Sequence, residues 1–550
     1  MPDHVTSALV LILPWPLILV GLLAGRAADR HARRVRRLTQ GAASFAVFAA
    51  LLAALNYRWG MARSVTYVAV VLPVGLGRLA ITVYVNALTV LMILLVSFVG
   101  LIVARYSSRY MDGDAHEGRF HRWLSLTLGA FFTLIVTGNI WGFFLSWFVT
   151  SLSLHELLAF YRERPGAVLA ARKKYLLHRL SDVALFVAFV LVIRTLRTSQ
   201  FAGLVPALAA HPGPLPAPLE IAAGLILLSA VLKSAQFPTH GWLIQVMEAP
   251  TPVSALMHAG IIYTGAFLLL RTSPLIARVD WAWDVLIVGG LASVAAASLM
   301  MMTATNIKES LAYSTCAQMG FMLMECGLGL YSVAVLHIIA HSVYKAHAFL
   351  SSGSVVDTFR APVPSVVPRP TTLAAGAGAL AAATAATIGA GALFGATLQR
   401  EPALIAVGAV LTAATAQLLL QAFRARSSGT AGVLLRLAVL CVLVAVAYFG
   451  LHRLFVHLLG TSLPPERLQA HGVPPVLLWL IATIFLGLLL LQQALPRIRE
   501  KPLGQAAWVH LYNDLYVDDF LSRLVHGLER STRMRGLRPS LRRPPRDASS

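Results

Sequence analysis

Charged residues are scarce in this sequence. Lys, Arg, Asp and Glu make up 12% of the 550 residues, about half of the roughly 25% in an average soluble domain, and hydrophobic residues make up 57%. Uncharged runs recur along the chain, many of them long enough to cross ~30 Å of hydrocarbon. The runs are continuous and do not alternate, which excludes a membrane β-barrel as well as a string of soluble domains. We therefore predict an all-α polytopic membrane protein.

Cysteine and the common cofactor motifs are also lacking. The three cysteines, Cys316, Cys326 and Cys441, lie inside apolar runs and lack the spacing of metal ligands or of a disulfide framework. No Gly-rich phosphate loop, Walker motif, Rossmann fingerprint or nucleophile elbow occurs. We expect no cofactor, no metal and no catalytic residue in this chain, and we predict that it is not an enzyme.

Acidic residues are also few: the sequence has 23 Asp and Glu against 45 Lys and Arg, which gives a net charge of +22. Nucleic acid is nevertheless excluded as a partner, because the basic residues occupy loops and form no basic face with interleaved aromatic residues. Residues 26–37, 105–122 and 162–179 carry six, four and six Lys or Arg. Two apolar runs separate each loop from the next, so the three loops share one face. The positive-inside rule makes that face cytoplasmic.

The same rule orients both ends of the chain. The amino terminus is expected in the periplasm of a bacterial cell inner membrane, and the first apolar run is interpreted as a retained helix because no basic residue precedes it. The tail Arg530–Arg546 holds seven arginines and is expected in the cytoplasm. The number of spans is then odd.

The apolar runs predict about 13–15 transmembrane helices, some of them broken. The runs lie at residues 7–25, 41–58, 80–104, 123–142, 143–161, 176–195, 219–237, 250–271, 282–303, 309–330, 332–350, 372–396, 403–424, 433–457 and 474–494. We expect five regions in order. These are amino-terminal helices (1–122), a core (123–425), carboxyl-terminal helices (426–500), an amphipathic cytoplasmic segment (501–530) and a disordered basic tail (531–550).

Lys233 is one of several ionisable residues at membrane depth, where a charge costs at least ~2.5–3.5 kcal/mol. It ends an uncharged run and precedes Pro238, which should break the helix nearby. A broken helix is tolerated in a membrane only where it lines protein or a wet cavity. Because desolvation disfavours the charged form, a lysine there can exchange a proton. The alternative is a lysine that snorkels from a helix end.

His337, His341 and Lys345 are spaced four residues apart and predict one stripe on one helix. Imidazoles titrate close to physiological pH and suit a proton relay. Two histidines one turn apart also suit a metal, but no acidic or thiol ligand is close in sequence, and a lysine repels a cation. The pattern favours a proton path. Asp182, three residues after Arg179, is either part of such a path or simply neutralised at a cytoplasmic helix end.

Residues 508–528 place apolar side chains at helical spacing with acids and bases between them. The pattern predicts an amphipathic helix that lies on the membrane surface or docks a partner. Asp518 and Asp519 favour a protein partner, because anionic lipid would repel them. The predicted docking residues are Trp508, Tyr512, Tyr516, Asp518 and Asp519.

Four motifs resemble the antiporter-like subunits of respiratory complex I and of Mrp antiporters. They are the segment 233–238, Met247-Glu248-Ala-Pro-Thr-Pro with His258, the segment 306–320, and the histidine stripe. In that family such residues form a polar axis for protons, and an acid pairs with the lysine of the broken helix. The resemblance implies an axis of Lys233, Asp182, Glu248, His258, Lys308, His337, His341 and Lys345.

The sequence also departs from that family. The family's glutamate after a tryptophan is replaced here, since Phe148 follows Trp147, and His155 and Glu156 are the nearest ionisable substitutes. The late broken helix of the family carries a lysine, whereas residues 389–395 carry none. We also expect the chain to lack the family's long lateral helix.

This altered form resembles the membrane subunit of the DAB inorganic-carbon accumulation complex. The resemblance implies a subunit that conducts protons, or Na+, through the lipid membrane. It also implies that this flow energises the hydration of CO2 to bicarbonate by a large cytoplasmic subunit resembling a zinc carbonic anhydrase. The zinc is expected in the partner. Two alternatives stay open, an Mrp-type antiporter or complex I-like pumping subunit, and a membrane anchor that conducts nothing.

Overall fold

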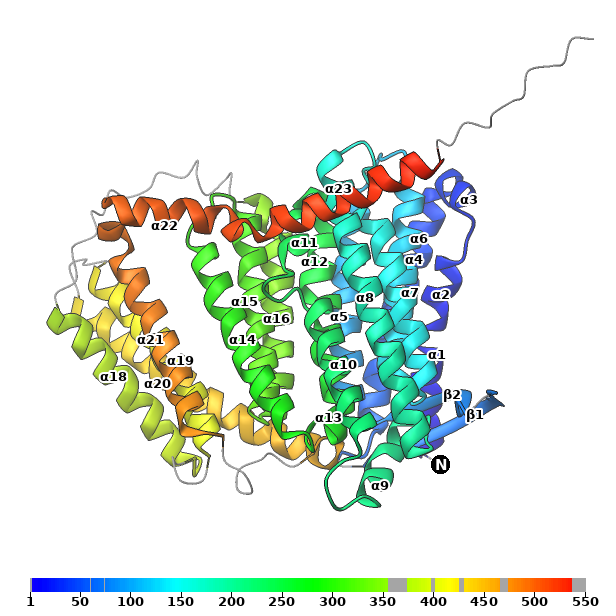
Figure 1. Cartoon of the computed structure of the whole chain (residues 1–550), viewed down its shortest axis with the longest axis horizontal. Helices are drawn as coiled ribbons and strands as arrows, with labels where there is room; N and C mark the ends of the chain where they lie inside the picture. The colour runs from blue at the N-terminus through cyan, green and yellow to red at the C-terminus, as the bar shows by residue number, and fades with distance from the viewer. Residues whose placement is uncertain are drawn as a thin grey trace, which may run out of the picture.

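The computed structural model describes residues 2–59, 61–73, 75–354, 373–396, 401–424, 430–464 and 473–536. Within them the chain folds into a bundle of helices that run roughly side by side (Figure 1). Ten of the described helices are long and apolar enough to cross a membrane. They are α4 (Ala32–Asn56), α5 (Ala87–Tyr110), α8 (Pro165–Leu196), α12–α13 (Thr251–Ile276), α14 (Asp280–Met301), α16 (Tyr331–Leu350), α18 (Leu373–Leu393), α19 (Pro402–Arg424), α20 (Thr430–Leu459) and α21 (Pro475–Ile498).

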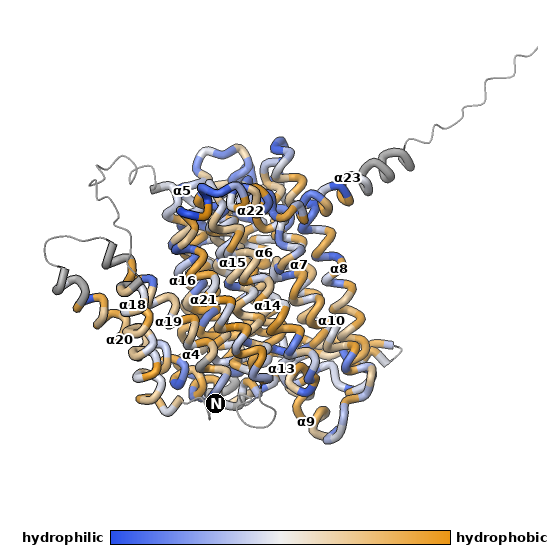
Figure 2. Tube along the Cα trace, turned by 60° about the vertical axis from the view of Figure 1, so that its left-hand side comes forward, coloured by the Kyte–Doolittle hydropathy of each residue, from blue (hydrophilic) through white to orange (hydrophobic). Residues whose placement is uncertain are grey.

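Further helices run alongside these ten (Figure 1). They are α1 (Pro2–Ile12), α2 (Trp15–Gly21), α6 (Glu117–Val136), α7 (Ile140–Leu158), α10 (Ala217–Lys233) and α15 (Ile307–Gly327). Asn86, Asn139 and Asn306 begin α5, α7 and α15 by accepting hydrogen bonds from backbone N–H groups of the first turn. Hydrophobic residues extend along the helices, and hydrophilic residues gather toward their ends (Figure 2). The all-α polytopic fold is confirmed.

The helices include two breaks that bear on function. The chain leaves α10 at Lys233, turns through residues 234–240 and resumes as α11 (Gly241–Gln245). It breaks again between α12 (Thr251–Ala259) and α13 (Thr264–Ile276), after Gly260. Residues 389–393, in the segment compared above with a late broken helix, form the end of α18, and residues 394–395 follow it. Gly395 adopts φ +74°, and the Ala396 N–H donates to the Gly391 carbonyl at 2.9 Å, as in a Schellman cap.

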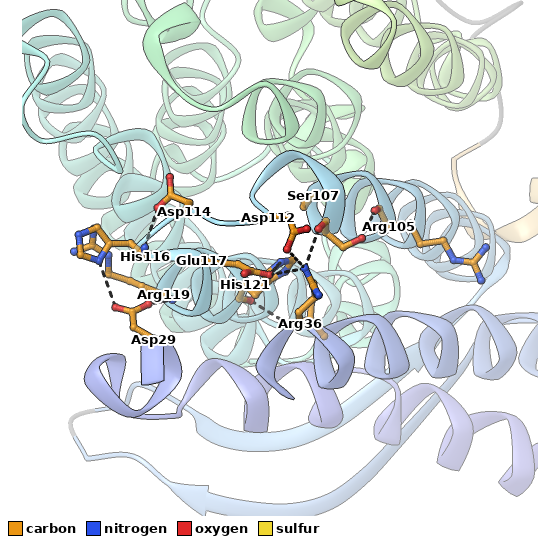
Figure 3. A network of polar contacts seen from close by, with 12 residues as sticks. Asp29, Arg36, Arg105, Ser107, Asp112, Asp114, His116, Glu117, Arg119 and His121 are labelled. Carbon is orange, nitrogen blue, oxygen red and sulfur yellow. Dashed lines mark hydrogen bonds and ion pairs between the residues drawn. The ribbon is translucent and has the colours of Figure 1, made fainter. Parts of the chain in front are cut away.

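The basic loops lie at one end of the bundle, which we call the basic face. It carries α3 (Gly25–Arg30) and the carboxyl-terminal helices, and the amino terminus lies at the other end (Figure 1). Arg36 joins two of the loops through Asp112 at 2.9 Å and Glu117 at 3.0 Å, as Figure 3 shows. The backbone N–H of Arg119 also donates to Asp29 Oδ1 at 2.6 Å. The shared face is therefore as predicted, and its assignment to the cytoplasm stays a prediction.

Two elements in the first half of the chain correct the expectations. Arg63–Val71 (β1) and Arg78–Val85 (β2) form an antiparallel hairpin, so the helix predicted from residue 80 begins only at Ala87. Valine, threonine and isoleucine in these strands favour extended backbone, because branching at Cβ restricts the side chain in a helix. The third basic loop is shorter than predicted, since α8 begins at Pro165 and holds Lys173 and Lys174 inside the fold.

The carboxyl-terminal segment is two helices instead of the predicted one. Pro502–Tyr512 (α22) and Val517–Gly536 (α23) flank a turn in which Asp514, Leu515 and Tyr516 have positive φ. Both helices lie across the basic face, α22 against α14 and α21, and α23 against α8 and α11 (Figure 1). These two helices are the predicted amphipathic segment. Helix α23 also continues past 531, where a disordered tail was predicted, and residues 537–550 lie outside the described part of the chain.

Candidate functional site: two buried polar clusters

Lys233 ends α10 beside Asp182 of α8. Its Nζ lies 3.2 Å from Asp182 Oδ1, and each side chain is only 5% exposed. The side chain therefore does not reach the membrane surface, which decides against a snorkelling lysine. Because Pro238 has no N–H to continue the helix, α10 stops and the ammonium group sits at the break.

Asp182 has partners on three sides. Arg179 Nη2 lies 2.7 Å from its Oδ2, and Trp147 Nε1 donates to its Oδ1 at 2.8 Å. Lys233 Nζ also lies 4.3 Å from the centre of the Trp147 ring, within cation–π range. Asp182 therefore pairs both with Arg179 on its own helix and with Lys233 at the helix break.

Helix α8 carries further buried polar groups at intervals of one turn. Lys174 Nζ donates to the Ser151 carbonyl at 2.6 Å, and His178 Nδ1 lies 3.0 Å from Ser151 Oγ. Since Lys174, His178 and Asp182 are four residues apart, they share one face of the helix. We call the whole group the lysine cluster. Its members are Trp147, Ser151, Lys174, His178, Arg179, Asp182 and Lys233.

A cavity of about 10 Å³ adjoins the lysine cluster. Lys233, His178 and Trp242 line one side, and residues of the α12–α13 break, among them Ile261 and Thr264, line the other. This volume is close to the minimum that admits one water molecule. The cavity therefore separates the lysine cluster from the α12–α13 break by about the width of one water molecule.

A second cluster of polar groups joins α15 and α16. His337 Nδ1 lies 3.0 Å from Glu325 Oε2, and its Nε2 lies 2.7 Å from Gln318 Oε1. The His337 and His341 rings are 6.0 Å apart and nearly perpendicular. Glu325 is buried, and its carboxylate contacts His337 away from solvent.

This second cluster continues to the α12–α13 break. His341 Nδ1 lies 2.7 Å from the Tyr263 hydroxyl, which in turn donates to the His258 carbonyl at 3.1 Å. His258 Nδ1 lies 3.0 Å from Thr315 Oγ1. We call this group the histidine cluster. Its members are His258, Tyr263, Thr315, Gln318, Glu325, His337 and His341.

Lys345 lies one turn beyond His341 on α16. Its side chain is fully buried, and its Nζ donates to the Leu311 carbonyl at 2.7 Å. The predicted stripe of His337, His341 and Lys345 is therefore present, and His347 is exposed. Among the residues that the structure describes, no three His, Cys, Asp or Glu side chains gather as a metal site.

Other predicted axis residues lie apart from the two clusters. Glu248 is half exposed and pairs with Arg164 at 3.5 Å, so it lies outside both clusters and its place in the proton pathway stays a prediction. Lys308 lies in the first turn of α15 and donates to Thr251 Oγ1 at 3.2 Å, toward the basic face. Glu156 pairs with Arg162 at 3.0 Å.

His155, the other predicted substitute for the family glutamate, lies two turns of α7 beyond Trp147. Its ring stacks obliquely near Tyr175, with centroids 5.4 Å apart. Neither His155 nor Glu156 forms a hydrogen bond or ion pair with Asp182 or Lys233 in the described structure. The group that reaches Asp182 from α7 is the Trp147 indole.

The predicted docking residues divide between two sides of the lateral helices. Tyr512, Tyr516 and Asp519 are exposed, whereas Trp508 is partly covered by Arg499, 4.4 Å from its ring. Asp518 faces the bundle and pairs with Lys173 at 2.7 Å. The Asp518 carboxylate therefore has its ionic partner within this chain, and the docking role of these residues stays a prediction.

Several members of the two clusters were not singled out from the sequence. Glu325 is an acid inside an apolar run and could have been found by the rule that flags ionisable groups at membrane depth. Lys174 and His178 continue the four-residue spacing that ends at Asp182. Tyr263 gave no such signal, because a tyrosine in an apolar run is ordinary.

The histidine cluster yields a first prediction. His337→Ala and His341→Ala should each reduce proton flux, on the order of 100-fold for loss of an acid–base group. His347→Ala should leave the flux near the wild-type value, because the exposed ring contacts neither cluster. Flux is measured with a pH-sensitive dye in proteoliposomes, per inserted chain. Equal flux in all three variants would mean that the stripe only packs.

Comparison with known proteins gives two family matches. Residues 137–363 match the family described as "NADH:quinone oxidoreductase/Mrp antiporter, TM", and every member of both clusters lies in this range. Residues 72–121 match "NADH-Ubiquinone oxidoreductase (complex I), chain 5 N-terminus".

Individual relatives and a solved structure agree with these matches. The chain is 41% identical over 527 residues to the "Probable inorganic carbon transporter subunit DabB2" of Halothiobacillus neapolitanus, covering 95% of this chain and 94% of that protein. It is 46% identical over 276 residues to the DabB counterpart of Hydrogenovibrio crunogenus, covering 50% and 53%. The Mrp complex of Dietzia sp. shares the fold, with a TM-score of 0.66 at 22% identity over 98% of this chain and 60% of the other.

Proposed function

Since the chain belongs to the DabB family of inorganic carbon transporter subunits, within the complex I and Mrp antiporter-like group, we propose that it conducts protons to energise carbon uptake. The proton flow drives the hydration of CO2 to bicarbonate by a large soluble partner that resembles a zinc carbonic anhydrase. The observation that carries this proposal is the pair of buried polar clusters that both adjoin the α12–α13 break. An inert anchor has no need of ionisable groups in this position, because each one is costly to bury.

The histidine cluster provides a route from the far end of the bundle. Glu325 lies two residues before the end of α15, whereas Tyr313, near its start, contacts the carboxyl-terminal turn on the basic face. Protons that enter at Glu325 pass to His337 along the hydrogen bond between them and cross to the His341 ring, 6.0 Å away. From His341 they reach the Tyr263 hydroxyl along a second hydrogen bond. Each imidazole can take up a proton at one nitrogen and release it from the other.

The lysine cluster receives the proton and supplies the exchangeable ammonium group. Asp182 holds Lys233 at the break, and Arg179 and Trp147 hold Asp182. The cavity beside Lys233 borders the α12–α13 break, so we assign the step from the histidine cluster to Lys233 to this place. This chain's own part is to position and relay the proton; we assign the zinc chemistry to the partner.

We assign the partner to the basic face, because the positive-inside rule predicts that this face is cytoplasmic. Helices α22 and α23 present a row of exposed apolar side chains there, unlike a surface that faces water alone. They are Leu503, Val509, Tyr512, Leu515, Tyr516, Phe520 and Leu524.

Purification through a tag on this chain tests the proposal. We expect a large soluble zinc-containing subunit to co-purify, and the reconstituted chain to acidify or alkalise proteoliposomes along an imposed proton gradient. The complex should also support growth that depends on inorganic carbon. Sodium-dependent proton exchange without such a partner would instead establish an Mrp-type antiporter.

A further inference from the structure

Two carboxylates of the carboxyl-terminal turn reach into the basic face of the bundle. Asp514 begins the short 3-10 helix Asp514–Tyr516, and Asp518 lies in the first turn of α23. Both carboxylates face α11, the short helix that follows the break after Lys233. We call residues 514–518 the carboxylate turn.

Asp518 binds one end of α11 and a buried lysine together. Its Oδ2 lies 2.7 Å from Lys173 Nζ and accepts from Gln245 Nε2 at 2.5 Å. Lys173 Nζ also donates to Gln245 Oε1 at 2.9 Å, which closes a three-membered network. The Lys173 side chain is fully buried, and Asp518 is its ionic partner in the described structure. A buried ammonium group without a carboxylate is strongly disfavoured, so this contact is a strong constraint.

Asp514 lies beside the other end of α11. Its Oδ1 accepts a hydrogen bond from the Tyr313 hydroxyl and lies 3.8 Å from Nε2 of His240, the residue that precedes α11. Tyr313 belongs to α15, and Lys173 belongs to α8. The carboxylate turn therefore clamps α11 between the helices of the histidine cluster and of the lysine cluster.

Steric fit and backbone conformation support the clamp. A Cβ on Gly241, the first residue of α11, would lie 2.0 Å from Asp518 Oδ1, so only glycine allows this approach. Asp514, Leu515 and Tyr516 have φ values of 54°, 52° and 62°, a backbone conformation that residues other than glycine rarely adopt. Such a conformation persists only where neighbouring contacts hold it.

We propose that Asp514 and Asp518 are positioning residues for Lys233, because they hold α11 and thereby the helix break at which Lys233 exchanges its proton. Only the final step, the proton exchange, rests on the proposed function. The carboxylates touch α11 and its neighbours and not Lys233 itself. A partner that binds the exposed side of α22 and α23 can therefore shift α11, because Asp514 and Asp518 of the same segment contact it. The position of Lys233 at the helix break would change with α11.

Hydrogen exchange of residues 234–245 in the full-length chain tests the clamp. Asp518→Asn removes the charge at constant size, and Gly241→Ala displaces Asp518 while keeping every charge. Both should speed exchange of this segment about tenfold, because local opening becomes easier once its tertiary contacts are lost. Asp519→Asn is the matched control, since it changes the neighbouring exposed aspartate in the same way.

Two further readouts separate positioning from general stability. Exchange of α14 should stay unchanged in all variants. Proton flux per inserted chain should fall with Asp518→Asn but not with Glu500→Gln, which neutralises an exposed carboxylate just before α22. The clamp is overturned if Asp518→Asn and Asp519→Asn exchange alike at residues 234–245, or if α14 loosens equally. If the wild-type chain conducts no protons, the proposed function fails, while the exchange comparison still decides the clamp.

Discussion

Replacing Lys233 with alanine is expected to abolish proton flux through the chain, with a loss on the order of 100-fold or more. Lys233 is the ammonium group at the helix break, and it contacts Asp182 at 3.2 Å beside the cavity that borders the α12–α13 break. Without it, the lysine cluster has no exchangeable group at that point. Proteoliposome flux under an imposed pH gradient, normalised to inserted protein, measures the loss.

The variant should still fold and insert. Removing one member of a buried ion pair ordinarily destabilises by ~3–5 kcal/mol, because the other charge is left alone. Here Asp182 keeps Arg179 at 2.7 Å and the Trp147 N–H at 2.8 Å, so the carboxylate stays paired. Asp182→Ala should be more harmful, since two cations then lose their partner.

Lys233→Arg distinguishes a proton-exchanging group from a charge that merely pairs. Arginine can keep the contact with Asp182 but does not release its proton, so flux should remain lost. The exposed Lys501 offers a matched control, because Lys501→Ala removes a lysine charge outside both clusters. Full flux in Lys233→Arg would refute the assigned role of Lys233.

Ending the chain before Trp508 is expected to release the soluble partner while the bundle remains inserted. The truncation removes the exposed apolar side chains from Val509 to Leu524, which include Tyr512, Tyr516 and Phe520. Aromatic side chains of this kind often contribute most of the binding energy at protein interfaces. A chain that ends after Arg530 keeps this row and should retain the partner. Pull-down through an amino-terminal tag measures retention.

A point variant separates docking from the clamp. Truncation before Trp508 also removes Asp514 and Asp518, whereas Phe520→Asp changes only an exposed side chain that is 73% accessible. Loss of one hot-spot aromatic weakens binding by about 2 kcal/mol, or ~30-fold, so Phe520→Asp should weaken retention without loosening α11. If the chain that ends before Trp508 still retains the partner in full, the partner docks on the basic loops instead.

Sequence reasoning alone predicted the membrane class, the common face of the three basic loops and the break after Lys233. Each follows from local physics: apolar runs of sufficient length, charges that avoid hydrocarbon, and a proline that cannot continue a helix. The stripe of His337, His341 and Lys345 is local in the same sense, since it depends only on the repeat of one helix.

Tertiary structure decided which of these groups meet. The partners Glu325–His337, Tyr263–His341 and Lys173–Asp518 join different helices, and the last pair is 345 residues apart in sequence. Asp518 and Asp519 are equivalent by composition, yet one faces the bundle and the other is exposed, because the turn at 514–516 sets the rotation of α23. Helical periodicity describes the faces of one helix, but the neighbour that each face meets depends on how the helices pack.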